Sequence, residues 1–250
     1  MSLRDHLREL RNRLIKAMLA ILIGLVIGLI VAEPVQDFIN APYCDRFAEK
    51  CKFTAQSPVE PFLLTLKVGL YVGILLASPF WLYQLWAFIA PGLYRREKRW
   101  AYIFAAVATP LFLAGAILAH FVVSKGLSFL LPSDQSPYDV DVNISGYFDF
   151  VTGMLLIFGA AFEFPLIVFM LNLAGVASAK KLLSWWRIVV FLIFVFTAIV
   201  TPTPDPFGMT ALAIPMSILY FMAVGAAFLN DRRRARRAST ELPDDVASPL

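Results

Sequence analysis

The sequence has little charge and few of the residues on which enzymes depend. Charged residues make up 16% of its 250 residues, against about 25% in a soluble domain, and 59% are hydrophobic. It holds only two histidines, His6 and His120, and no His/Cys/acid cluster with metal-ligand spacing. A glycine-rich phosphate loop and a nucleophile-elbow serine are also missing. We therefore expect neither an enzyme, nor a metal site, nor a cofactor.

Long apolar runs dominate the chain, and the mean hydropathy is +0.71. A membrane-spanning helix needs roughly 17–25 apolar residues. The fifth run is the shortest, because Pro202 and Pro204 end it early, and a thinned membrane would accommodate it. The sequence predicts an all-α integral membrane protein with a six-span domain over residues 1–229. The expected spans are about 14–32, 68–90, 100–123, 150–174, 187–201 and 208–229.

The distribution of Lys and Arg predicts the orientation of these spans. With six spans, most of the 22 basic residues lie on the side that carries both termini, which we expect to be the cytoplasmic side of the cell membrane. Residues 230–250 are charged and contain Pro243, so we expect a cytoplasmic tail without regular structure. The net charge of +4 follows from this topology, and no basic soluble domain indicates a nucleic-acid partner. The basic residues expected on the opposite side are Arg46, Lys50, Lys52, Lys67 and Lys125.

Four of the expected spans contain an internal proline, namely Pro79, Pro110, Pro165 and Pro215. A proline within a helix removes one backbone hydrogen bond and bends the helix. The sequence therefore predicts tilted, bent helices that form a concave bundle.

Glu163 interrupts the otherwise uncharged run over residues 150–179. A carboxylate at the centre of a bilayer costs about 2.5–3.5 kcal/mol on insertion scales, so it needs a partner or a task. Pro165 leaves the carbonyl of Ala161 without its helical donor. We expect Glu163 to face the inside of the bundle and to be either neutral or in contact with water. From the residues alone, three alternatives stay open: a proton-coupled small-solute transporter with Glu163 as its proton site, a polar contact that fixes helix packing, and a structural anchor.

Acids are rare among the many bases of the expected cytoplasmic side. Glu9 has Arg13 one helical turn later, so it can form an ordinary i,i+4 ion pair. Glu97 can be a solvated loop charge beside its basic neighbours. A second interpretation is that Glu9 and Glu97 face one site. Two carboxylates suit a partner with two adjacent arginines, because each guanidinium binds a carboxylate through two hydrogen bonds.

Six short segments carry a family resemblance. Each is a weak signal alone, but their order and the six-span topology together are specific. They resemble the TatC family, the receptor subunit of the twin-arginine protein translocase. The segments are HLRELRNRL at 6–14, SPVEPF at 57–62, SPFWLYQLWAFIAPGLYRRE at 78–97, FEFP at 162–165, TPD at 203–205 and AIP at 213–215.

The resemblance implies a receptor that binds twin-arginine signal peptides at the cytoplasmic face. With single-span TatA-type and TatB-type partners, such a receptor moves folded proteins across the lipid bilayer in an oligomeric complex. Transport in this family uses the proton motive force, which suits a sequence without a nucleotide-binding motif.

The resemblance also assigns residues. Glu9 and Glu97 match the two carboxylates that recognise the arginine pair, and Arg11 and Phe88 match positions of the same site. Glu163 matches the intramembrane acid of the family. The outer positions of the family correspond to Pro42, Glu60 and Asp205.

Two positions depart from the family pattern near the expected partner-helix site. Met209 stands where members often have Gln, and Phe221 where they often have Glu. We expect the hydroxyl of Thr201, Thr203 or Thr210 to substitute for these polar groups. The residues expected to contact a partner helix are thus Thr201, Thr203, Asp205, Met209 and Thr210.

Both cysteines, Cys44 and Cys51, lie in the first loop expected outside the cytoplasm. That side can be oxidising, so they form either a disulfide or two free thiols.

Overall fold

The computed structural model describes residues 3–44, 53–89, 97–130, 142–201 and 206–240. Helices dominate these residues. The elements are α1 (Leu3–Ile30), α2 (Ala32–Cys44), β1 (Phe53–Thr54), α3 (Glu60–Leu76), α4 (Ser78–Ile89), α5 (Glu97–Leu130), β2 (Val142–Asn143), α6 (Ile144–Ala161), α7 (Phe164–Leu173), α8 (Ala179–Ser184), α9 (Trp186–Val200) and α10 (Pro206–Thr240).

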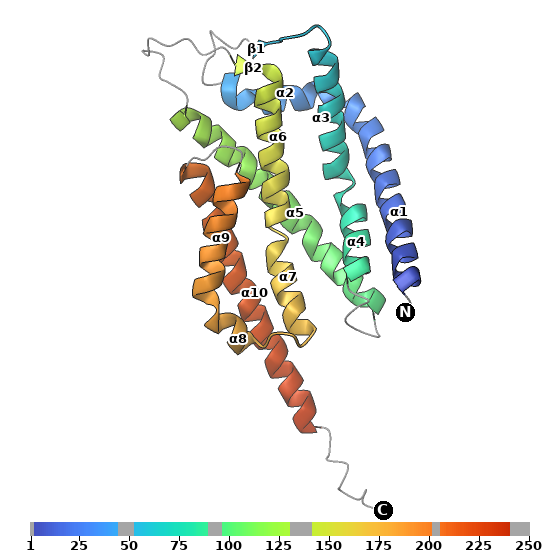
Figure 1. Cartoon of the computed structure of the whole chain (residues 1–250), viewed down its shortest axis with the longest axis vertical. Helices are drawn as coiled ribbons and strands as arrows, with labels where there is room; N and C mark the ends of the chain where they lie inside the picture. Colours follow the sequence, from blue (N-terminus) through green and yellow to red (C-terminus); the bar gives the residue numbers. More distant parts are fainter. Residues whose placement is uncertain (1–2, 45–52, 90–96, 131–141, 202–205, 241–250) are drawn as a thin grey trace, which may run out of the picture.

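The helices form an elongated bundle that α5 crosses obliquely (Figure 1). At one end, here called the N-terminal end, α1 begins, α4 and α7 end, and α8 lies across the bundle. At the other end, here called the strand end, α2 lies crosswise beside the two short strands. The strands pair in parallel, with Phe53 opposite Val142. The fold is thus that of an all-α membrane protein, as predicted, with this small pairing as its only strands among the described residues.

Helices α1 and α3 pack through glycines that are four residues apart on each helix. Gly24 and Gly28 of α1 face Gly73 and Gly69 of α3. A Cβ atom on Gly24 would lie 2.6 Å from the carbonyl oxygen of Gly73. Small residues at this spacing let helix backbones approach closely, which drives association where lipid gives no hydrophobic gain.

Two of the expected proline bends are breaks between helices. The pair α3 and α4 bends by 58° at Ala77, just before Pro79, and the indole Nε1 of Trp81 donates to the carbonyl of Ile74 across this bend at 3.0 Å. Helices α6 and α7 meet at Phe162 and Glu163, with Pro165 in the first turn of α7.

The two other prolines lie inside helices that continue past them. Pro110 is inside α5 and Pro215 is inside α10.

The described helices account for most of the expected spans. Four segments are long and apolar enough to cross a membrane: Arg4–Ile30, Tyr102–Leu127, Ile144–Leu173 and Pro206–Arg236. The bent pair Glu60–Leu76 and Ser78–Ile89 makes a fifth if it counts as one span. The expected fifth span corresponds to α9, which has only 15 residues. The six-span topology therefore stays a prediction.

The expectation that residues 230–250 lack regular structure is wrong for the first part of this segment, because α10 continues to Thr240. Its extension is held by polar contacts that hydropathy does not reveal. The carboxylate of Asp231 accepts hydrogen bonds from the backbone N–H of Ala179 at 2.8 Å and from Asn172 Nδ2 at 2.9 Å. These bonds attach residues beyond the apolar run to the connection between α7 and α8.

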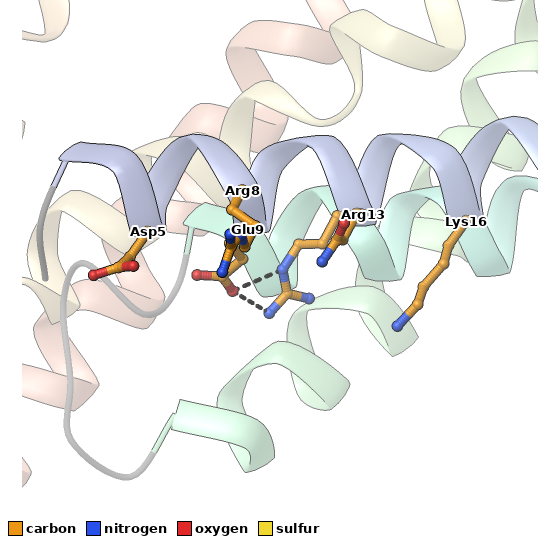
Figure 2. Close-up of a pocket in the computed structure, with 6 residues that line it drawn as sticks. Asp5, Arg8, Glu9, Arg13 and Lys16 are labelled. Atoms are coloured by element: carbon orange, nitrogen blue, oxygen red, sulfur yellow. Dashed lines mark hydrogen bonds and ion pairs between the residues drawn. The ribbon is translucent and has the colours of Figure 1, made fainter.

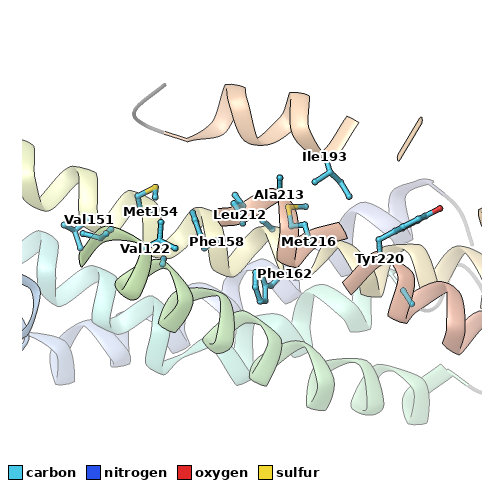
Figure 3. Packing of buried hydrophobic residues seen from close by; sticks show 14 of the residues in the cluster. Val122, Val151, Met154, Phe158, Phe162, Ile193, Leu212, Ala213, Met216 and Tyr220 are labelled. Carbon is cyan, nitrogen blue, oxygen red and sulfur yellow. The ribbon is translucent and has the colours of Figure 1, made fainter. Parts of the chain in front are cut away.

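The main core lies where α5, α6, α9 and α10 meet. Figure 3 shows Met154 and Phe158 of α6 close to Leu212 and Met216 of α10. Ile193 contributes from α9. A second cluster joins α4, α5 and α7, and it includes Trp86, whose indole contacts Glu163. The bundle is therefore packed on both sides of α6 and α7.

Candidate functional site

One face of α1 forms a shallow polar hollow at the N-terminal end of the bundle. Its volume is about 360 Å³ (Figure 2). The lining side chains recur at helical spacing, so a single helix presents acids and bases together. They are Asp5, Arg8, Glu9, Asn12, Arg13 and Lys16.

Glu9 forms the i,i+4 ion pair that the sequence allowed. Arg13 donates from Nε at 2.9 Å and from Nη2 at 2.6 Å, and both bonds end on Oε1 of Glu9. Among the described residues, Oε2 accepts no hydrogen bond. The Glu9 side chain is 23% exposed. Arg13 thus binds only one of the two oxygens of this partly exposed carboxylate.

An apolar groove of about 250 Å³ lies between α1 and α4, and Arg13 borders both this groove and the polar hollow. Phe88, in the last turn of α4, lines the groove and stacks on His6 with ring centroids 4.6 Å apart. The structure thus places Phe88 near the helix face that carries Glu9. The groove is lined by Leu10, Arg13, Leu14, Ala17, Ile21, Trp81, Gln84, Leu85 and Phe88.

The other two predicted members of this site are less closely defined. Glu97 is the first residue of α5, which begins at the N-terminal end of the bundle (Figure 1). The structure does not describe its side chain. Arg11 is exposed on α1 and is not among the residues that line the hollow or the groove. The structure therefore places Glu9 and Phe88 in two adjoining hollows that share Arg13, and Arg11 lines neither of them.

Glu163 lies in the break between α6 and α7 and is only 8% exposed. The indole Nε1 of Trp86, on α4, donates to its Oε2 at 3.3 Å. The other carboxylate oxygen, Oε1, is buried and has no hydrogen-bond partner among the described residues. Trp86 is fixed in turn by stacking on Phe104 of α5, with ring centroids 5.0 Å apart. The predicted inward orientation of Glu163 is confirmed.

The predicted partner-helix residues differ in how accessible they are. Thr201 is buried, and its hydroxyl donates to the carbonyl of Thr197 at 2.8 Å. This placement does not favour direct contact between Thr201 and a partner helix. Thr210 is half-buried and donates to the carbonyl of Pro206 at 2.7 Å. Met209 beside it is also half-buried.

Two members of this predicted set, Thr203 and Asp205, lie outside the described residues. Their part in partner contact stays a prediction.

The predicted outer-loop residues lie at the strand end. Pro42 is in the last turn of α2. Glu60 begins α3, where its carboxylate accepts hydrogen bonds from the backbone N–H of Gln56 and, at 3.1 Å, from Asn143 Nδ2. Because Asn143 caps α6, Glu60 connects the starts of α3 and α6.

Cys44 is the last residue of α2, and Cys51 lies outside the described residues. Their disulfide therefore stays a prediction.

Sequence reasoning missed two features of the site. The first is Trp86, although a tryptophan inside an apolar run needs an acceptor for its N–H and could have been paired with Glu163. The second is the pair of glycine motifs, which a search for Gly-x-x-x-Gly in apolar segments would have found.

No group of three His, Cys, Asp or Glu side chains in the described ranges could hold a metal ion.

These features define a class of protein: an all-α membrane protein with a polar hollow and an apolar groove at one end and a carboxylate buried between its helices. The family model for "Sec-independent protein translocase protein (TatC)" matches residues 5–215. The chain belongs to the TatC family and is a component of a Sec-independent protein translocase.

Relatives of known family support this assignment. The TatC protein of Frankia casuarinae is 44% identical over 265 residues, which cover 100% of this chain and 73% of that protein. The TatC protein of Aquifex aeolicus is 35% identical over 240 residues, covering 94% of this chain and 98% of that protein.

Two crystal structures of a twin-arginine translocase receptor, TatC, share the fold. One has a TM-score of 0.72 at 36% identity and covers 90% of this chain and 98% of its own. The other, in the detergent DDM, has a TM-score of 0.76 at 35% identity and covers 89% of this chain and 99% of its own.

Proposed function

We propose that this protein is the receptor that binds twin-arginine signal peptides for the translocase. The observation that carries the proposal is the position of Glu9 in an arginine-rich hollow that adjoins the groove bordered by Phe88. Signal peptides have a positively charged segment followed by 7–15 apolar residues. The carboxylate suits the arginines, and the groove suits the apolar segment.

The basic residues of the polar hollow oppose the binding of a positively charged peptide. Arg8, Arg13 and Lys16 repel a cationic peptide, so Glu9 supplies the local attraction. The peptide guanidinium binds Oε2 of Glu9, because both bonds from Arg13 end on Oε1. We propose that Glu97, at the start of α5, supplies the second carboxylate, as the family resemblance implies.

The rest of the proposed mechanism concerns the partners and the membrane. TatA-type and TatB-type single-span proteins dock on the bundle, and the oligomeric complex moves folded cargo using the proton motive force. Both termini lie in the cytoplasm, which puts the hollow where signal peptides arrive. No catalytic activity is assigned to the protein, since the family is a translocase subunit and receptor family.

A peptide-capture experiment tests the proposal. The purified full chain in detergent is titrated with a fluorescent signal peptide carrying Arg-Arg, and with the same peptide carrying Lys-Lys. We expect the Lys-Lys peptide to bind at least several-fold more weakly, because lysine cannot make the two-bond contact with a carboxylate. Equal binding of the two peptides would reject the proposed site.

A further inference from the structure

A second basic surface lies at the N-terminal end of the bundle, away from the polar hollow of α1. It is the corner between α8 and α9 (Figure 1). Lys181 Nζ lies 5.0 Å from the ring centroid of Trp185, and the guanidinium of Arg187 lies 5.5 Å from that of Trp186. Both tryptophans are exposed, although each has a cation over its ring. The corner therefore presents large aromatic surfaces and positive charge together.

A hollow of about 590 Å³ opens at this corner. It is lined by Lys180, Leu183, Ser184, Trp186 and Arg187. Two cationic groups stand beside an aliphatic side chain and an indole. The lining thus offers contacts to an anion and to hydrocarbon within one site.

In the part of the chain that the structure describes, no acid forms an ion pair with the basic side chains of the corner. The sequence contains no Asp or Glu from residue 164 to residue 204. Among the described residues, Lys180, Lys181 and Arg187 form no ion pair. Asp231 lies close by, but its two carboxylate oxygens accept hydrogen bonds from Asn172 and Ala179.

The extension of α10 adds to this charge. Five arginines follow Asp231 on the extension, at positions 232, 233, 234, 236 and 237. Arg234 lies beside the connection between α7 and α8, where its Nη1 would be 3.4 Å from a Cβ atom added to Gly175. The extension of α10 therefore adds positive charge beside the connection that leads into α8.

The corner also lies where a membrane surface is expected. From Ile188 to Val200 α9 is uncharged and rich in Phe, Ile and Val. Tryptophans concentrate at the level of the lipid headgroups, where one side of the ring meets hydrocarbon and the other meets water. Trp185 and Trp186 lie just before this apolar segment, separated from it by Arg187, so we expect the hollow at headgroup depth.

We propose that this hollow binds the headgroup of an anionic glycerophospholipid. Lys180 and Arg187 contact the phosphate, and Leu183 and Trp186 contact the first part of the acyl chains. The occupant is a lipid and not a soluble phosphate, because two of the five lining residues, Leu183 and Trp186, are apolar and the apolar part of α9 continues from the hollow. Bound lipid would hold α8 and the short helix α9 at a fixed depth in the membrane.

Native mass spectrometry of the full chain in a mild detergent tests this site. The chain is titrated with phosphatidylglycerol, with phosphatidylcholine and with glycerol 3-phosphate, which lacks acyl chains. We expect saturable binding of phosphatidylglycerol and weaker binding of the other two. A Lys180→Gln/Arg187→Gln variant should bind phosphatidylglycerol about tenfold or more weakly, since each basic side chain near the surface contributes a substantial attraction.

Matched variants distinguish lipid binding in this hollow from non-specific attraction of anionic lipid to positive charge. Arg4→Gln/Arg8→Gln removes the same charge from exposed positions of α1 at the same end of the bundle, and it should bind the lipid as the wild type does. Lys180→Arg/Arg187→Lys keeps the charge and should retain binding. The thermal stability of each variant without lipid shows that it is folded. Equal losses in the two charge-removing variants, or equal binding of phosphatidylcholine or glycerol 3-phosphate, would overturn the proposal.

Discussion

Trp86 and Glu163 are 77 residues apart in the chain and are joined by a hydrogen bond from the indole Nε1 to Oε2, 3.3 Å long. The bond connects α4 to the break between α6 and α7. It satisfies one carboxylate oxygen, while Oε1 is buried without a partner among the described residues. Burial of an oxygen without a partner is costly, so we expect water or a polar group to contact Oε1.

Variants of Glu163 test whether this carboxylate takes part in transport. We expect Glu163→Ala to abolish transport, because it removes the buried carboxylate from the break between α6 and α7. Glu163→Gln keeps the size and a carbonyl that accepts from Trp86, but it cannot ionise. Transport of a folded cargo into membrane vesicles is the measurement, with Glu33→Gln, an exposed acid of α2, as the control. If Glu163→Gln transports normally and Glu163→Ala does not, the role of Glu163 is hydrogen bonding. If both variants lose transport, Glu163 must ionise for transport to occur. Normal transport by both variants would remove Glu163 from the mechanism.

Glu9→Gln should weaken capture of a twin-arginine peptide by about three- to tenfold, the low end for a charged contact at a wet surface. The Glu9 side chain is partly exposed, so a larger effect is not expected. Fluorescence anisotropy with the purified chain measures the affinity, and Glu33→Gln serves again as control. Unchanged affinity in a Glu9→Gln/Glu97→Gln double variant would contradict the proposed site.

The close packing of α1 on α3 predicts a stability difference between two glycine substitutions. Gly28→Ala brings a Cβ atom against the backbone carbonyl of Gly69, so the helices must move apart, at a cost of about 1–3 kcal/mol. Gly225→Ala in α10 meets nothing within 4 Å and should be neutral or slightly stabilising, because Ala favours helix. Thermal unfolding in detergent measures both. A Gly28→Ala protein as stable as the wild type would show that α1 and α3 can accommodate the added methyl group without loss of stability.

Crosslinking tests where a partner helix docks. Phe196 is 41% exposed on α9, whereas the adjacent Thr197 is fully buried. Cysteine at Phe196 or at Met209 should form adducts with a TatA-type helix in native membranes, because these side chains reach the surface. Cysteine at Thr197 should form none. Labelling of Phe196 by lipid probes alone, with no partner adduct, would place the partner elsewhere.

The predicted bond between Cys44 and Cys51 would close a short loop after α2. It should stabilise the folded protein by at most a few kcal/mol, mainly by restraining that loop in the unfolded chain. Mass spectrometry of non-reduced peptides from the native membrane should find the two residues linked. Recovery of both as alkylated thiols would refute the bond.

The sequence was sufficient for the class of protein and for most of its helices. Apolar runs predict spanning helices reliably, because a bilayer core has no water and each helix must satisfy its own backbone. Pro79 and Pro165 predicted the positions of two breaks, since proline removes a helical hydrogen bond wherever it falls. The motif around Glu9 and the lone acid at position 163 indicated the polar residues of the candidate site.

Only the tertiary structure decided which of these residues meet. Contact between Glu163 and Trp86, or between His6 and Phe88, depends on the rotation of each helix about its axis and on the angle at which the helices cross. The hydropathy pattern contains little information on either quantity. The same holds for the end of α10. Composition alone predicts no structure from residue 230, but hydrogen bonds from Asn172 and Ala179 to Asp231 hold this segment as helix, because the partners come from the distant turn before α8.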